Sequence, residues 1–220
     1  MAHPLILASG SPRRQQFLRE LGLTFRVVVA DIDETPLPDE APIPLAQRLA
    51  TAKAQAVAAR LPVGEGGLII AADTVVAQGA ELLGKPVDDA DAVRMLQALR
   101  AGPHHVHSGI SLLDTVSGQQ VSRVNSTLVQ MRDYSDAELA DYVATGDPLD
   151  KAGAYAIQHP TFAPVSALAG CISGVIGLPL AELRDLLAAF GITLPVPVAT
   201  VCTRHTPFPC CQLKGSTVAT

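Results

Sequence analysis

The stretch "LILASGSPRRQQFLREL", residues 5–21, decides the fold and raises a question about charge. It opens with an apolar run that is typical of a buried strand. Ser11 followed by Pro12 is typical of a helix start, because serine is a good N-cap and proline suits the first helical position. The pattern therefore predicts a strand, a short loop and a helix, with Arg13 and Arg14 in the first helical turn.

Two arginines in that turn need a negative partner. A helix N-terminus already carries partial positive charge, so each guanidinium there is unfavourable by ~0.3–1 kcal/mol when no negative group lies near it. The small loop residues and the free helix N–H groups form an anion site, and arginine binds phosphate oxygens in a bidentate manner. The loop matches neither GxxxxGK[ST] nor GxGxxG. We expect a phosphate clamp of another kind; the alternative is that both arginines point into solvent.

The rest of the chain alternates strands and helices. This pattern predicts a mixed α/β sheet flanked by helices, in one domain over residues 1–194. Residues 195–220 contain prolines, threonines and cysteines without a sustained period, and we expect a poorly ordered tail outside the core. Strands are expected at 24–31, 66–76, 106–114, 121–131 and 165–169, and helices at 43–62, 88–99, 135–145 and, as the last one, 179–190.

Composition excludes several classes of protein. A net charge of −5 argues against a nucleic-acid polymer as partner, because such a protein needs a broad basic face. No stretch approaches the roughly 20 apolar residues of a membrane span, and no basic region precedes the first apolar run, so we expect no membrane association and a cytoplasmic location. The four cysteines form no disulfide framework, and Cys202, His205, Cys210 and Cys211 fit no standard zinc spacing.

Carboxylates follow two of the predicted strands. Asp73 ends the apolar run "LIIAAD", where open α/β sheets place their ligands, and a carboxylate there must be hydrogen-bonded, paired or bound to metal. The alternative is that Asp73 only caps a turn. The turn "DIDET" offers Asp31, Asp33 and Glu34, hard oxygen ligands that suit Mg²⁺ or Mn²⁺; taken alone it is a solvated acidic loop.

Three lysines complete the charged set. Lys53 lies beside the apolar stripe of its helix, and Lys85 and Lys151 stand in glycine-containing loops that allow close approach to a ligand. Together with the arginines and carboxylates they indicate a polyphosphate site with a divalent metal. The cluster His104, His105 and His107 is given a surface or edge-strand role, because no supporting carboxylate stands nearby in the sequence.

Four motifs in this order resemble the Maf family of nucleoside triphosphate pyrophosphatases: "LILASGSPRRQQFLRELGL", "AADTVV" followed by "LGKP", "DKAGAYAIQ" and "GVIGLPL". The resemblance covers residues 4–192. It implies a mixed α/β sheet in two lobes around a cleft, similar to inosine triphosphatases, a homodimer, and Mg²⁺ or Mn²⁺ as cofactor. The form "KAGAYAIQ" is similar to the subgroup that acts on dTTP and UTP rather than on 7-methyl-GTP.

The resemblance also implies roles for particular residues. Asp73 would be the catalytic proton acceptor and, with Glu34, a metal ligand. Gln158 would select the base, since an amide offers both donor and acceptor to uracil or thymine. Substrate-binding and specificity positions would be Ser9, Arg13, Arg14, Lys53, Thr74, Lys85, Lys151 and Gln158. Ser108 replaces the family's usual threonine and keeps the hydroxyl, and the stretch after Gln158 is longer than usual.

The function expected from these residues is hydrolysis of dTTP and UTP, extending to modified pyrimidine triphosphates, to the monophosphate and pyrophosphate. One alternative is a nucleotide-binding regulator of cell division whose hydrolysis is slow or incidental. Another is a nucleotidyltransferase, since a Gly-Ser-Arg loop after a first strand and a later "KP" are also found in that class.

Overall fold

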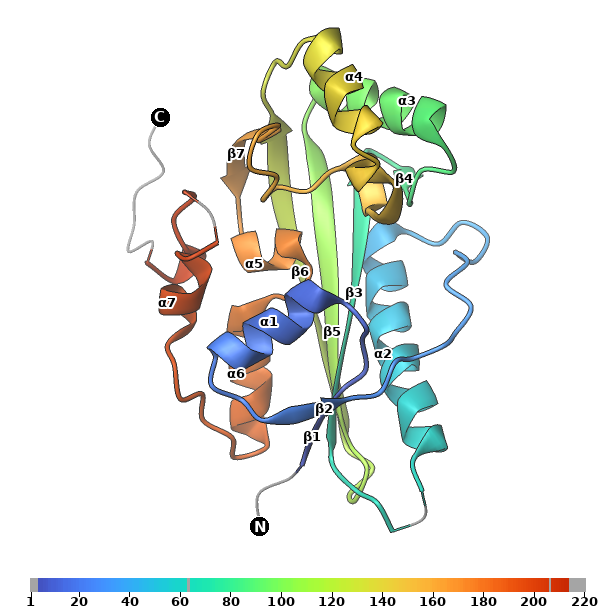
Figure 1. The fold of residues 1–220 in the computed structure, drawn as a ribbon. Helices are drawn as coiled ribbons and strands as arrows, with labels where there is room; N and C mark the ends of the chain where they lie inside the picture. Colours follow the sequence, from blue (N-terminus) through green and yellow to red (C-terminus); the bar gives the residue numbers. More distant parts are fainter. Residues whose placement is uncertain (1–3, 63, 206, 214–220) are drawn as a thin grey trace.

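The computed structural model of the chain describes residues 4–62, 64–205 and 207–213. Its centre is a seven-stranded mixed sheet of order β2-β1-β3-β5-β6-β7, with β4 paired to β3 (Figure 1). β1 runs parallel to β2 and β3, and the other pairs are antiparallel. The strands are β1 (Leu5–Leu7), β2 (Phe25–Val27), β3 (Leu68–Gln78), β4 (Glu81–Leu83), β5 (His104–Asp114), β6 (Gln120–Met131) and β7 (Val165–Ala169).

Helices cover both faces of this sheet, which confirms the predicted fold class. α2 packs against β3, β5 and β6, while α5 and α6 contact β5 and β6. The helices are α1 (Pro12–Glu20), α2 (Pro42–Arg60), α3 (Asp89–Ala101), α4 (Asp136–Ala144), α5 (Ile172–Ile176), α6 (Leu180–Ala189) and α7 (Val198–Cys202), with 3-10 turns η1 (Asp147–Asp150), η2 (Ala152–Ala154) and η3 (Cys211–Leu213).

Alternation along the buried strands divides the lower core into two layers. Leu7 and Ile70 pack with Phe17 of α1 and with residues of α5 and α6. Their neighbours Ile69 and Ala71 point the other way and pack with α2. Since successive side chains of a strand point to opposite faces, both faces of β1 and β3 must be apolar, as these sequences are.

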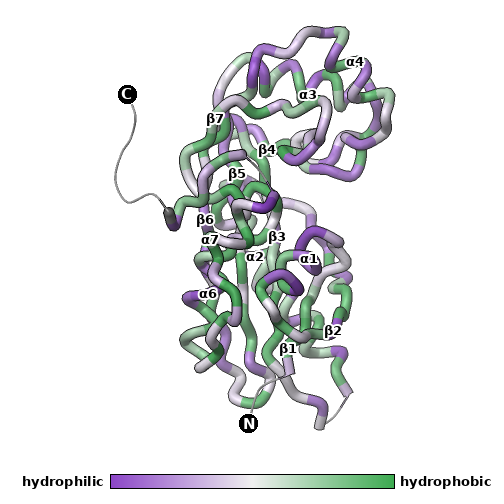
Figure 2. The backbone as a smooth tube through the Cα atoms, turned by 60° about the vertical axis from the view of Figure 1, so that its left-hand side comes forward, coloured by the Kyte–Doolittle hydropathy of each residue, from purple (hydrophilic) through white to green (hydrophobic). Residues whose placement is uncertain are grey.

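The second lobe forms because the strands β3, β5 and β6 extend beyond the end of β1. The β3–β5 ladder extends from Leu68 paired with Asp114 to Ala77 paired with His105, whereas β1 pairs with β3 only as far as Ile70. The upper part of these strands packs with α3, α4, η2 and all three tyrosines of the chain. Figure 2 shows the two lobes one above the other, which confirms the expected two-lobed arrangement.

The segment that follows residue 194 differs from the tail expected there. Val198, Val201 and Cys202 of α7 and the following Cys210 are buried in the same core as α1 and α6. The expectation of a segment outside the core is wrong for these residues. It arose because α7 has only five residues, too few for its apolar side chains to show a helical period in the sequence. Residues 206 and 214–220 of this segment lie outside the described residues.

Three further expectations need correction. β5 lies between β3 and β6, so His104 and His107 are buried in an inner strand, and a surface or edge role holds for neither; His105 alone is exposed. The short helix α5 had no predicted counterpart, and α6 is not the last helix. Ser11 stands at the start of α1, but its side chain makes no capping hydrogen bond. Over the described part of the chain, no helix combines the length and apolarity needed to cross a membrane.

Candidate active site

A cleft of about 540 Å³ opens between the two lobes. Residues from α1, α2, β3 and the loops around η1, η2 and α5 line it. The ten residues predicted for the site all contribute to its lining: Ser9, Arg13, Arg14, Glu34, Lys53, Asp73, Thr74, Lys85, Lys151 and Gln158.

The cleft lies where one edge of β3 is open. The edge of β3 is paired with β1 up to Ile70 and with β4 from Val76 onward. Between these points no strand of the described residues lies beside the edge, and Asp73 stands in the middle of this gap. Its position after "LIIAA" predicted that Asp73 ends the strand. This prediction is wrong, because β3 continues to Gln78 and Asp73 is an inner residue of it. It does lie past the carboxyl end of the parallel β1–β3 pairing, which is where α/β sheets bind ligands.

Asp73 belongs to the face of β3 that packs on α2. Lys53 of α2 is buried at this point, and its Nζ donates to Asp73 Oδ1 at 2.6 Å. The same Nζ lies 2.7 Å from Oε1 of Glu34, whose side chain is 56% exposed. One ammonium thus joins a buried carboxylate to an exposed one, and the buried carboxylate is paired as its position requires.

Glu34 and Asp73 are two oxygen ligands for a divalent cation, fewer than such an ion needs for a complete coordination shell. Among the described residues, no group of three or more His, Cys, Asp or Glu side chains could hold a metal ion. The chain thus offers two carboxylates, Glu34 and Asp73, that meet at one ammonium. Mg²⁺ is commonly bound through one or two carboxylates, with substrate phosphates and water completing its shell. The donor set fits a metal ion that binds together with a phosphorylated substrate.

Thr74 points to the opposite face of β3, where it meets Arg14. Arg14 Nε donates to the Gly177 carbonyl at 2.8 Å and Nη1 to Ser9 Oγ at 3.1 Å, while Nη2 lies 3.5 Å from Thr74 Oγ1. Burial lowers the pKa of Arg14, and the charges of Asp73 and Glu34 act in the opposite direction. Arginine keeps its charge under such conditions, so Arg14 is a fixed cation with a set orientation.

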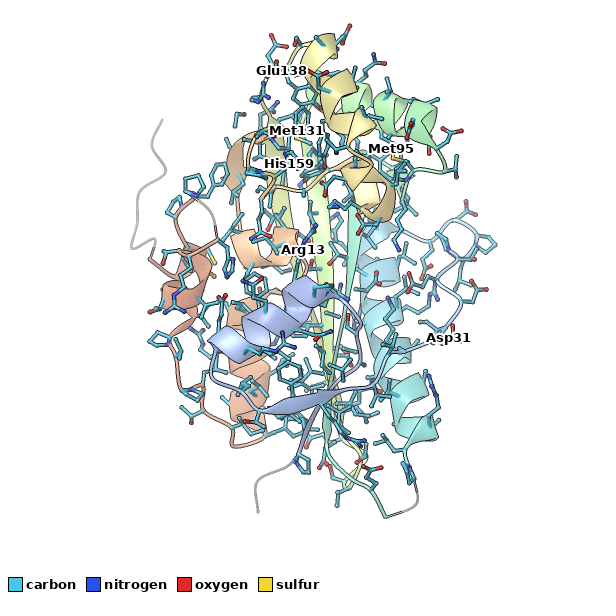
Figure 3. All side chains as sticks on the ribbon, in the orientation of Figure 1. Arg13, Asp31, Met95, Met131, Glu138 and His159 are labelled. Atoms are coloured by element: carbon cyan, nitrogen blue, oxygen red, sulfur yellow. The ribbon has the colours of Figure 1, made fainter. Side chains whose placement is uncertain are left out.

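Two further cations of the cleft, Arg13 of α1 and Lys85 of an upper loop, are free to meet a ligand. Arg13 projects from α1 toward the upper lobe, whereas Asp31 lies away from the cleft on the outer side of the molecule (Figure 3). In the part of the chain that the structure describes, the side chains of Arg13 and of the exposed Lys85 form no hydrogen bond or ion pair. Both cations line the cleft with unused donors.

Lys151 is held more firmly. Its Nζ lies 2.9 Å from Asp147 Oδ1 and 2.6 Å from Asp150 Oδ1 and also donates to the Asp147 carbonyl at 2.5 Å. Gly153 follows with a φ of 69° and sits against Val76, where a side chain would be strained. Its N–H donates to the Gly84 carbonyl, which brings the Lys151 loop beside the Lys85 loop.

Two backbone carbonyls, of Gly177 and Gly174, and the contacts of the Ser108 hydroxyl were not predicted from the sequence. Gly177 holds Arg14, and Ser108 Oγ lies 3.0 Å from Thr74 Oγ1 and donates to the Gly174 carbonyl at 2.7 Å. The motif "GVIGLPL" indicated that this loop belongs to the site. It did not indicate that the Gly177 carbonyl binds Arg14, because every residue has a backbone carbonyl and a side-chain pattern cannot single one out. Ser108 was noted for its hydroxyl, which here links β5 to α5.

A mixed α/β fold with two lobes, whose cleft gathers four further cations around the Lys53 ion pairs, defines a protein that binds a polyanion. The chain belongs to the family described as Maf-like protein, whose sequence model matches residues 4–190.

Several curated proteins are similar to this chain over most of its length. A dTTP/UTP pyrophosphatase of Pelotomaculum thermopropionicum is 43% identical over 187 residues, 85% of this chain and 96% of the relative. Proteins of the same name from Geobacter sp. (strain M21) and Anaeromyxobacter dehalogenans are 45% and 46% identical over 85% and 89% of this chain, and 95% and 98% of the relatives. The solved structure of a HAM1 protein from Coxiella burnetii covers 86% of this chain and 100% of its own, with 19% identity and a TM-score of 0.48.

Proposed function

We propose that this protein is a nucleoside triphosphate pyrophosphatase that hydrolyses dTTP and UTP to the nucleoside monophosphate and pyrophosphate. The observation that carries this proposal is the convergence of Arg13, Arg14, Lys85 and Lys151 on one cleft around the Lys53–Asp73 pair. Relatives named dTTP/UTP pyrophosphatase at 40–46% identity support it.

The cations bind and orient the triphosphate. Arg14 is fixed by its contacts to Gly177 and Ser9 before the substrate arrives, so little side-chain entropy is lost when it meets a phosphate. Arg13 and Lys85 donate to phosphate oxygens from the lower and upper sides of the cleft. The N–H groups at the start of α1 add a partial positive charge. Together these groups neutralise charge that develops on the leaving pyrophosphate.

Asp73 accepts a proton from the attacking water. The water oxygen forms a bond to the α-phosphorus, the bond between that phosphorus and the bridging oxygen breaks, and the pyrophosphate leaves with the bonding electrons. Lys53 orients Asp73 through the hydrogen bond of 2.6 Å from its Nζ to Oδ1. We propose that Glu34 and Asp73 hold Mg²⁺ or Mn²⁺ with the phosphates; such a metal supplies Lewis-acid stabilisation of the phosphoryl oxygens.

The experiment that tests this function replaces Asp73 and follows pyrophosphate separately from single phosphate. With dTTP or UTP and Mg²⁺ or Mn²⁺, Asp73→Asn is expected to slow pyrophosphate release by about 100-fold or more, the usual contribution of a positioned proton acceptor. Asp31→Asn is the control, because Asp31 is an exposed carboxylate in the acidic loop that carries Glu34, away from the cleft (Figure 3). Release at a near wild-type rate by Asp73→Asn contradicts the assignment of Asp73. Release of single phosphate by the wild type contradicts the reaction.

Two finer features belong to the same proposal. We propose that the protein acts in the cytoplasm, where nucleoside triphosphates are abundant, and that it forms a homodimer, as the family resemblance implies. Sedimentation velocity of the full chain measures the second feature directly, and a single species at the monomer mass contradicts it.

A further inference from the structure

The segment after the family match contacts a residue that lines the substrate cleft. The match ends at residue 190, and the chain then continues through α7 to His205 and on to η3. α7 is anchored in the core by Val198, Val201 and Cys202. This segment, residues 195–205 and 207–213, is called the C-terminal segment below.

One contact joins the C-terminal segment to the lining of the cleft. The amide nitrogen Nε2 of Gln158 donates to the backbone carbonyl of His205 at 3.4 Å. Gln158 lines the cleft and is the residue proposed to meet the base. A carbonyl accepts only, so it turns the NH₂ end of the Gln158 amide toward the C-terminal segment and leaves the oxygen on the other side.

His205 is itself held in place by its side chain. Nε2 of His205 lies 2.6 Å from Oε2 of Glu20, at the end of α1, and both side chains are largely buried, with exposures of 12% and 21%. The ring also packs edge-on against Phe17 of the same helix, with ring centroids 5.1 Å apart. The hydrogen bond from His205 lowers the pKa of Glu20, against the effect of burial. α1, which carries Arg13 and Arg14, thus fixes the position of the carbonyl that holds Gln158.

We propose that His205 is a positioning residue for base selection: its carbonyl locks the orientation of the Gln158 amide. Uracil and thymine present a donor at N3 and an acceptor at position 4, whereas cytosine presents the reverse. An amide that is free to turn by 180° satisfies both patterns, and a locked amide satisfies one. The C-terminal segment therefore sets the discrimination between keto and amino pyrimidines. This inference rests on the proposed function, because it deepens the role of Gln158 in the same site.

The test compares UTP with CTP. His205→Ala removes the anchor on Glu20 and Phe17, and we expect the ratio of kcat/KM for UTP to that for CTP to fall about fivefold, as for the loss of one oriented hydrogen bond. The turnover of UTP at saturation should change less than twofold, which a general loss of structure would not produce. His205→Gln, whose amide can still donate to Glu20, should restore most of the ratio. Thr203→Ala is the matched control, since Thr203 is exposed and bonds only to carbonyls of its own helix.

A double-mutant cycle separates positioning from other effects. If His205 acts through Gln158, then His205→Ala added to Gln158→Ala leaves the ratio of the single Gln158→Ala variant unchanged. An unchanged ratio in His205→Ala alone, or a further full fall in the double variant, overturns the proposal.

The failure of the proposed function would look different. Absence of pyrophosphate release from every triphosphate contradicts the reaction but not the amide lock. The dissociation constants of UTP and CTP, measured by calorimetry in EDTA for the wild type and His205→Ala, then decide the matter. A ratio of these constants that is the same in both proteins overturns the lock.

Discussion

His104 shows how a single buried side chain ties stability to pH. Its Nε2 lies 2.8 Å from the Tyr155 hydroxyl, and its Nδ1 is buried with no hydrogen-bond partner among the described residues. Burial, with a smaller contribution from His105, lowers the pKa of His104 to about 4. The folded protein therefore holds this ring neutral.

The sign of the pH effect follows from this pKa. The unfolded chain protonates His104 near pH 6.5 and the folded chain only near pH 4, so unfolding takes up a proton between these values. Stability is present above pH 6.5 and is lost as the pH falls, by about 3 kcal/mol once the pH is below 4. We expect urea unfolding of His104→Gln to lose less free energy between pH 7 and pH 5 than that of the wild type. His105→Gln removes only the smaller contribution to the His104 pKa, so its pH slope should stay much closer to that of the wild type than to that of His104→Gln. Equal pH slopes for wild type and His104→Gln would refute the assignment.

The charged residues of the site were predictable from the sequence, but their partners were not. Asp73 and Arg14 stood out because an apolar strand or a helix terminus makes such charges costly without a counter-ion, whereas Lys53 was marked only by its place beside an apolar stripe. The Lys53–Asp73 pair joins residues 20 positions apart and depends on how α2 crosses the sheet. No local pattern encodes that crossing. The Gly177 carbonyl that holds Arg14 is a backbone group 163 positions away, which only the tertiary fold brings near.

At the scale of elements, the packing of α2 on β5 depends on Gly109. A side chain at this position would overlap the Ala46 carbonyl oxygen of α2. Gly109 also pairs with Asp73 across the β3–β5 ladder. A close approach of α2 to the sheet thus lies beside Asp73, the residue that Lys53 of α2 contacts.

A methyl group at this contact should separate the two elements. We expect Gly109→Ala to lower the free energy of unfolding by about 3 kcal/mol, as for overpacking against backbone, measured by urea denaturation. Gly102→Ala is the control, because a side chain there makes only an ordinary contact with Gln78. A change below about 0.5 kcal/mol in Gly109→Ala, similar to an ordinary surface substitution, would show that α2 does not rest on this glycine.

Elements with a strong period were predicted well, and those without one were not. The sequences of α2, β3 and the β5–β6 hairpin carry clear apolar patterns and turn signals, and the structure has them at the expected places. α5 and α7 have five residues each, too few to show a helical face. Their helical form comes from packing on the core, as the burial of Val201 and Ile172 shows.

At the scale of the whole molecule, the lobes share their longest strands. β3, β5 and β6 run through both, so neither lobe can lose its sheet without disturbing the other (Figure 1). The chain has no tryptophan, and its three tyrosines are all buried in the upper lobe. Tyrosine signals therefore report on the upper lobe alone, and far-UV circular dichroism on the whole fold.

We expect the two signals to lose their native values at the same urea concentration, because a continuous ladder makes unfolding a single cooperative step. Near-UV dichroism or fluorescence of Tyr134, Tyr142 and Tyr155 measures the first, and far-UV dichroism the second. A tyrosine transition at clearly lower urea would mean that the upper lobe unfolds on its own.

The Lys53 ammonium, which both Asp73 and Glu34 contact, affects how the protein folds. Two carboxylates brought together by folding repel each other unless a positive charge lies between them. Lys53 supplies that charge from within the chain. A newly synthesised molecule therefore needs no added cation between these two carboxylates in order to reach its native state.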